Sequence, residues 1–152
     1  MAVFLVLLVA LIAMCGFLGF GFGTLGRGGA RLRGWAGVAA GVTCAWYAWG
    51  MLAVGGAVLD AEDGGTGSAP IRPCVGGSPE SALVAVTYRV DYLPVRFVCE
   101  VQHGGDYATD DVPGYVNPAL AVGAFATVVL GAGAAIGSER AARRTTAPTE
   151  RV

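Results

Sequence analysis

The sequence predicts an α-helical membrane protein with three transmembrane helices and a small antiparallel β domain, held by a disulfide bond, between the second and third helices. Hydrophobic residues make up 55% of the 152 residues and charged residues only 14%, whereas soluble domains contain about 25% charged residues. The charges are also clustered, because residues 1–26, 34–59 and 112–138 contain none. A soluble protein spreads charge over its whole surface, so we expect these three stretches to lie in lipid.

Each uncharged stretch is long enough for one membrane span, which needs about 20 apolar residues. We place the three transmembrane helices at residues 1–23, 35–59 and 117–138. The start of the third helix is marked by two residues. Asn117 suits the cap position of a helix, and Pro118 suits the first helical position, where no N–H is needed.

The arginines predict the orientation in the membrane. The loop at 24–34 carries three arginines and no acidic residue, and the tail at 139–152 carries four arginines and two glutamates. Residues 60–116 carry nine acidic residues against three arginines. Because positive charge favours the cytoplasmic side, we predict a multi-pass protein of the plasma (cell) membrane. The loop and the tail then lie in the cytoplasm, and the N-terminus and residues 60–116 lie outside.

The segment between the second and third spans has the pattern of a small antiparallel sheet. Apolar and polar residues alternate over 83–92 and again over 95–102, with the period of two that is typical of strands. A turn is expected at 103–106, followed by a short third strand at 107–109. Residues 81–101 are excluded as a fourth span, because each of their central charges would cost about 2.5–3.5 kcal/mol in the membrane.

Two cysteines, Cys74 and Cys99, lie outside the predicted spans. A cysteine pair in an oxidising compartment is typical of a disulfide bond. So small a domain buries too little surface to be stable alone, and a bridge closing this loop adds about 3–4 kcal/mol. We therefore predict a structural disulfide. The Cys-x-x-Cys spacing of many redox-active pairs is missing.

Small residues line one face of two predicted spans. No Asp, Glu, Lys, Arg or His lies inside any span, although such residues mark proton and ion pathways. Small side chains let helix backbones approach closely in lipid. We predict helix-packing faces, and it stays open whether they meet the other spans or another protein. The residues are Ala119, Gly123, Thr127, Gly131 and Ala135 in the third span and Gly37 and Gly41 in the second.

Candidate ligand-binding residues are few. Tyr88, Tyr92 and Trp49 form a candidate ligand surface, if a pocket lies between the sheet and the helix ends. Cys15 and Cys44 come to similar depths in the first two spans, where we expect small packing residues. The sequence has no motif for a nucleotide, a metal or a nucleophilic serine. We expect no cofactor and no metal, and the few basic residues argue against nucleic-acid binding.

One short segment resembles a pattern found in other proteins. The run from Tyr92 to Glu100, followed by Gly104-Gly105, resembles a pattern in uncharacterised small polytopic membrane proteins of high-GC bacteria. The resemblance implies a similar β-hairpin outside the membrane, and it implies no activity and no functional residues.

Three functions are compatible with these features. The first hypothesis is a non-catalytic accessory or assembly subunit that acts through helix packing and its acidic outer domain. Its partners would be the lipid bilayer and either another membrane protein or a second copy of the chain. The alternative is an extracytoplasmic ligand-binding or sensor module. The third is a thiol–disulfide enzyme that uses Cys74 and Cys99.

Overall fold

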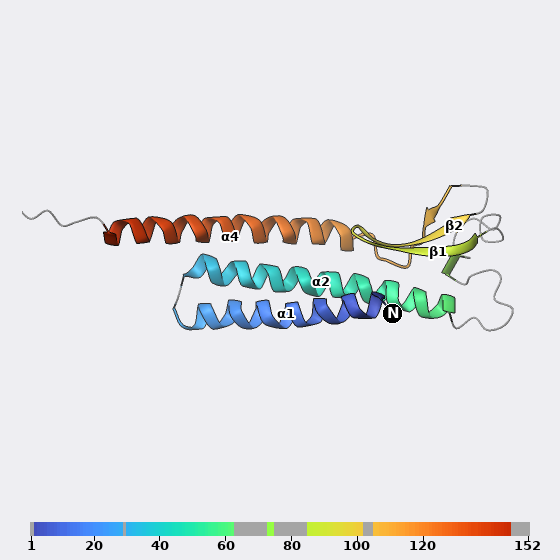
Figure 1. Cartoon of the computed structure of the whole chain (residues 1–152), viewed down its shortest axis with the longest axis horizontal. Helices are drawn as coiled ribbons and strands as arrows, with labels where there is room; N and C mark the ends of the chain where they lie inside the picture. Colours follow the sequence, from blue (N-terminus) through green and yellow to red (C-terminus); the bar gives the residue numbers. More distant parts are fainter. Residues whose placement is uncertain (1, 29, 63–72, 75–84, 102–104, 147–152) are drawn as a thin grey trace, which may run out of the picture.

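The computed structural model describes residues 2–28, 30–62, 73–74, 85–101 and 105–146 (Figure 1). Three long helices lie side by side, with α2 next to both α1 and α4, and a small sheet lies at one end of them (Figure 1). The elements are α1 Ala2–Gly26, α2 Arg31–Glu62, β1 Ala85–Tyr92, β2 Val95–Val101, β3 Tyr107–Ala108 and α4 Val116–Thr146. All three helices are long and apolar enough to cross a membrane, which confirms the predicted helix pattern.

The helices are longer than the predicted spans. Gly28 ends α1 with a φ of +66°, a left-handed conformation that glycine adopts without steric cost, and its N–H donates to the Leu25 carbonyl at 3.1 Å. The predicted basic loop at 24–34 is therefore shorter, because α2 already begins at Arg31. At the other end of the chain, α4 continues beyond residue 138 to Thr146. Arg, Glu and Ala are good helix formers, so charge ends the apolar stretch without ending the helix.

The sheet has the order β1-β2-β3 and is antiparallel throughout. Val90 pairs with Phe97, and Tyr92 pairs with Val95 across a turn of two residues, Leu93 and Pro94. This confirms the small antiparallel domain that the alternation predicts. Val98 departs from the alternation, because it is buried although its neighbours Phe97 and Cys99 are buried as well. It pairs with Ala108 of β3. The predicted turn at 103–106 and the exit segment after residue 62 lie largely outside the described residues.

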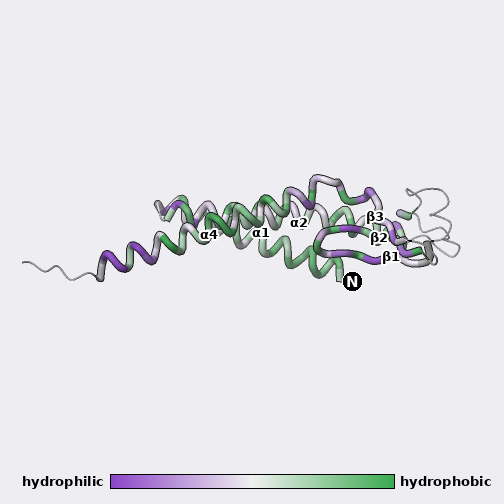
Figure 2. Tube along the Cα trace, turned by 90° about the horizontal axis from the view of Figure 1, so that it is seen from above, coloured by the Kyte–Doolittle hydropathy of each residue, from purple (hydrophilic) through white to green (hydrophobic). Residues whose placement is uncertain are grey.

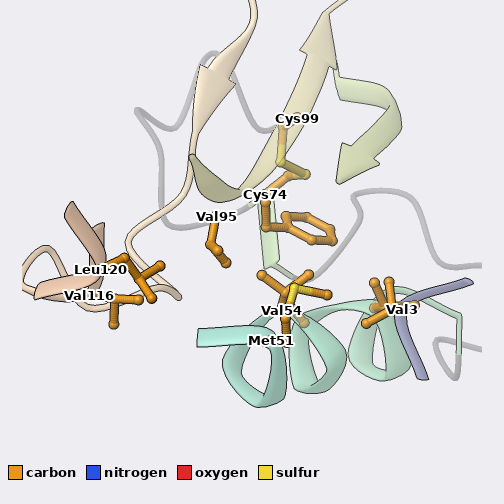
Figure 3. Close-up of a cluster of buried hydrophobic side chains, with 11 residues drawn as sticks. Val3, Met51, Val54, Cys74, Val95, Cys99, Val116 and Leu120 are labelled. Atoms are coloured by element: carbon orange, nitrogen blue, oxygen red, sulfur yellow. A yellow bond between two sulfur atoms is a disulfide. The ribbon is translucent and has the colours of Figure 1, made fainter. Parts of the chain in front are cut away.

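Most of the buried side chains lie in one cluster where the sheet meets the helices (Figure 3). Met51 and Val54 of α2 face Phe97 and the disulfide of Cys74 and Cys99, and all five are fully buried. Val3 of α1 and Val116 and Leu120 of α4 complete this buried cluster at its two sides. The sheet therefore packs on the last third of α2.

The rest of α1 and α4 shows the opposite distribution. Large apolar side chains are exposed along both helices; Leu5 is 66% exposed and Phe125 is 72% exposed. Figure 2 shows apolar residues along the helices and hydrophilic ones at the far end of α4. So long an exposed apolar surface is unusual for a soluble monomer and is typical of helices that contact lipid.

Candidate functional site

The contact between α1 and α2 is made by glycines. Gly37 and Gly41, two predicted packing residues, lie on α2 against α1. A Cβ atom at Gly37 would lie 3.0 Å from the Gly21 Cα, and one at Gly41 would lie 2.6 Å from the Leu18 Cγ. Sequence reasoning missed Gly21 itself, where a Cβ would lie 2.7 Å from the Val38 backbone nitrogen. It also missed Gly34, which shares one face of α2 with Gly37 and Gly41 at helical spacing.

The predicted stripe on α4 is covered over only part of its length. Gly123 lies against Thr43 of α2, because a Cβ at Gly123 would overlap the Thr43 hydroxyl oxygen. Thr127 donates its hydroxyl to the Gly123 carbonyl at 2.8 Å. Ala119 lines a groove beside α2. At Gly131 a Cβ would have no neighbour within 4 Å, and Ala135 is exposed. Among the described residues, the stripe therefore meets α2 in its first half alone.

The tip of the β1–β2 hairpin is bound to the helices by two polar side chains. Asn117 of α4 accepts the Val95 N–H at 2.8 Å and donates its amide to the Val95 carbonyl at 3.1 Å. Tyr47 of α2 donates its hydroxyl to the Tyr92 carbonyl at 3.3 Å. The prediction that Asn117 caps the third helix is wrong, because α4 begins one residue earlier, at Val116, and the amide bonds the hairpin instead.

A first groove of about 770 Å³ lies beneath this hairpin tip. α2 forms its floor, α1 and α4 form its walls, and the turn between the strands closes one end. Its hydroxyl and amide groups already have partners, since the Thr43 hydroxyl donates to the Ala39 carbonyl at 2.8 Å and Tyr47 and Asn117 bond the hairpin. The groove is thus apolar. Its lining includes Leu5, Val9, Thr43, Cys44, Tyr47, Leu93, Pro94, Leu120, Ala121 and Ala124.

A second groove of about 590 Å³ lies between α2 and α4 and shares Thr43 with the first groove. Trp35 and Trp46 of α2 and Val122 of α4 are among its lining residues. At its sheet-side end the Trp46 ring packs edge-on against Tyr115, with 5.8 Å between the ring centroids. α4 is therefore flanked by an apolar groove on each side.

The three residues predicted as a ligand surface have separate environments, and none of them lines either groove. Tyr88 stacks on Phe97 at 5.0 Å between ring centroids and donates its hydroxyl to Glu62 at 3.0 Å. Burial raises the pKa of Tyr88, and the bond to Glu62 and its negative charge raise it further. Tyr92 uses its carbonyl to bind Tyr47, and Trp49 is 53% exposed.

The predicted disulfide between Cys74 and Cys99 is present, with 6.0 Å between the two Cα atoms. Both cysteines are fully buried. Tyr107 of β3 donates its hydroxyl to the Cys74 carbonyl at 2.6 Å, and burial raises the pKa of this tyrosine. The disulfide and this bond together fix the segment at residues 73–74 to the sheet. Cys15 and Cys44 are free cysteines.

The outward face of the sheet is charged. Arg89 forms ion pairs with Asp91 at 3.1 Å, Glu100 at 3.4 Å and Asp106 at 3.7 Å. All four side chains are partly exposed, so each pair contributes little to stability. Within the described ranges, no group of three or more His, Cys, Asp or Glu side chains is placed to hold a metal ion.

Comparison with protein-family models, with curated proteins and with solved structures finds no match to this chain.

Proposed function

We propose that this chain is a non-catalytic integral membrane protein that acts as an accessory or assembly subunit, and that the first groove receives a transmembrane helix of a partner. The observation that carries the proposal is the open, apolar groove between α1 and α4, in which the hydroxyls of Thr43 and Tyr47 and the amide of Asn117 already have internal partners. Apart from the free thiol of Cys44, this groove offers shape and apolar contact.

The walls of the first groove suit a helix. On α4 it is lined by Ala121 and Ala124, and on α1 by Ala10, and small residues let a second helix approach closely in lipid. A helix is about 10 Å in diameter, so it would lie partly within the groove and partly in lipid. The fixed contact between α1 and α2 keeps the groove open, because the glycines hold α1 on α2 and away from α4.

The proposed subunit has its basic ends in the cytoplasm. Arg31 and Arg33 at the start of α2 and the arginines at the end of α4 lie at the end of the molecule opposite the sheet (Figure 1). Positive charge favours the cytoplasmic side, so the sheet and the N-terminus would lie outside. Labelling of intact cells with a membrane-impermeant maleimide tests this orientation. We expect Asp106→Cys to react and Arg140→Cys to react only after lysis, and the reverse pattern would overturn it.

A photo-crosslinking experiment tests the subunit role. A benzophenone side chain at Ala124, which lines the first groove, is compared with one at Phe125, which is exposed and lines neither groove. In native membranes we expect the Ala124 variant to give one discrete protein adduct and the Phe125 variant to give mainly lipid adducts. Equal lipid adducts at both positions, together with a lone monomer in mild detergent, would overturn the proposal.

A ligand-binding role is the second candidate, because the first groove has the volume of a small-molecule site, about 300–1,000 Å³. An apolar molecule that co-purifies with the wild type and is lost in Ala124→Trp would favour it. The thiol–disulfide enzyme is the least favoured, since both disulfide cysteines are fully buried and exchange requires access for an attacking thiolate.

A further inference from the structure

The turn at Leu93 and Pro94 lies beside the apolar helices. Both residues line the first groove together with Leu5 of α1 and Ala121 of α4. The residues on either side of the turn are bonded to Tyr47 of α2 and to the first turn of α4. In Figure 1 the turn between β1 and β2 lies next to the start of α4.

Two helices give the depth of this turn if they span a membrane. Glu139 is the first charge of α4, and the 21 residues from 118 to 138 measure about 31 Å, close to the ~30 Å of a hydrocarbon core. On α2, Tyr47 lies 14 residues beyond Arg33, or about 21 Å along the helix axis. Asn117 thus lies at the outer boundary of the hydrocarbon core and Tyr47 about 9 Å inside it. The turn, which both side chains bind, therefore lies in the outermost part of the core.

Backbone polar groups at this depth need partners, because lipid supplies none. The Tyr92 carbonyl is bonded by Tyr47, and both backbone groups of Val95 are bonded by Asn117. Pro94 has no N–H. The helices therefore satisfy the backbone groups that flank the turn, and the strands can approach lipid without leaving these groups unpaired.

The side chains around the turn match the layers of an outer leaflet, with an apolar tip, aromatic residues and then a positive charge. Leu93, at the tip, is 83% exposed. Tyr92 is its neighbour in the chain, and Tyr115 and Trp46 pack on each other near the start of α4. Such aromatic residues are enriched at membrane interfaces. Arg96 is exposed on the outward face of β2 and forms no ion pair with another described residue. Its guanidinium suits a lipid phosphate.

We propose that the hairpin turn inserts into the outer leaflet, with Leu93 among the acyl chains and Arg96 at the phosphates of the surrounding phospholipids. The proposal rests on the membrane embedding stated under the proposed function. It adds that the β domain is itself a lipid-binding element, which reaches the bilayer beside the helices.

Depth-dependent fluorescence quenching tests this insertion. The full chain carries Cys15→Ala and Cys44→Ala, keeps the Cys74–Cys99 disulfide, and has one new cysteine that bears a fluorophore. Leu93→Cys is compared with Phe125→Cys in the apolar first third of α4 and with Thr87→Cys near the far end of β1. Each variant is placed in phosphatidylcholine–phosphatidylglycerol nanodiscs with either a nitroxide on the upper acyl chain or aqueous iodide.

We expect the nitroxide to quench Leu93→Cys to within a factor of about two of its effect on Phe125→Cys, and iodide to quench Leu93→Cys only slightly. At Thr87→Cys we expect strong iodide quenching and little nitroxide quenching. If Phe125→Cys is shielded from iodide while Leu93→Cys is not, the insertion is wrong and the embedding stands. If Phe125→Cys is itself open to iodide, the embedding fails as well. A benzophenone at position 93 gives a second readout, since insertion requires a phospholipid adduct and a water-exposed turn gives none.

Discussion

α2 holds its two neighbouring helices by different kinds of contact. Against α1 the contact is backbone to backbone, since a Cβ at Gly21 would lie 2.7 Å from the Val38 nitrogen. Against α4 the contacts are made by side chains, between Gly50 and Val116, between Thr43 and Gly123 and between Leu32 and Gly133. At Gly131, further along α4, a Cβ would meet nothing. α1 is therefore positioned by backbone contact with α2, and α4 is positioned by side-chain contacts with α2 and by the Asn117 bonds to the hairpin.

The difference follows from the solvent that each contact excludes. In the proposed membrane placement there is no hydrophobic driving force between the helices, so close backbone approach has to stabilise the pair. The buried cluster under the sheet would exclude water instead, and burial of each Val or Met side chain there contributes about 1.5–3 kcal/mol. The first groove lies between α1 and α4, which α2 holds by these two kinds of contact. Variants that weaken one mechanism should leave the other intact.

Removal of the disulfide should have the largest effect on the β-domain side. Cys74→Ala with Cys99→Ala should destabilise the sheet by about 3–4 kcal/mol, because the bridge constrains a loop of sequence separation 25 in the unfolded chain. Denaturant titration in detergent, followed by near-UV circular dichroism, measures this change. Cys15→Ala is the control, and we expect it to have little effect. An unchanged midpoint in the double variant would contradict the role of the bridge.

A methyl group at Gly21 should weaken the contact between α1 and α2. Gly21→Ala should destabilise the α1–α2 pair by about 1–3 kcal/mol, the usual cost of overpacking, since the nearest atom is backbone and can move little. Gly131→Ala is the matched control, because a Cβ there meets open space. Helix unfolding in mixed detergent micelles measures both. Equal stability of the two variants would show that the helices are further apart than the glycines indicate.

Most of the fold could be predicted from local sequence patterns. Alternation predicted β1 and β2, the uncharged stretches predicted three apolar helices, and the cysteine pair predicted the bridge, because each of these signals lies within a few residues. The contacts of the hairpin tip did not follow from the sequence. Asn117 has the local features of a helix cap, yet it bonds Val95, which is 22 residues away. Such a partner depends on how the sheet packs on α2, and no local period encodes that packing.

The small-residue stripes show the same limit. Spacing alone favoured Gly131 as a packing residue as much as Gly123, but only Gly123 contacts α2. The Gly34–Gly37–Gly41 series was visible in the sequence. Its partner, Gly21, could be found only once the turn at Gly28 had set the register between α1 and α2.

Loss of the Asn117 amide should release α4 from the hairpin. Asn117→Leu keeps a side chain of similar size but removes two hydrogen bonds to Val95, which we expect to cost about 1–2 kcal/mol. Amide hydrogen exchange should rise at Val95 and leave α1 unchanged. Thr127→Val is the control on the same helix, because its hydroxyl bonds only its own helix at Gly123. Unaltered exchange at Val95 would mean that packing alone holds the hairpin tip.

The smallest effect is expected at Tyr88, where the end of α2 meets β1. Tyr88→Phe keeps the stacking on Phe97 and removes the bond to Glu62, which should cost about 0.5 kcal/mol because the pair is exposed. Burial and then Glu62 raise the pKa of Tyr88 above its usual value near 10. The native state therefore holds this proton more tightly than the unfolded state.

This contribution to stability is fully present below pH 10 and is lost as the pH rises through the raised pKa of Tyr88. Tyr88→Phe should flatten the alkaline decline in stability without abolishing it, because the pKa of Tyr107 is raised as well. Glu62→Gln should give an intermediate slope, since it removes the negative charge but keeps an oxygen acceptor. Thermal unfolding between pH 8 and pH 11 distinguishes the three proteins. Identical slopes would show that Glu62 and Tyr88 do not interact, and that α2 meets the sheet through the buried cluster alone.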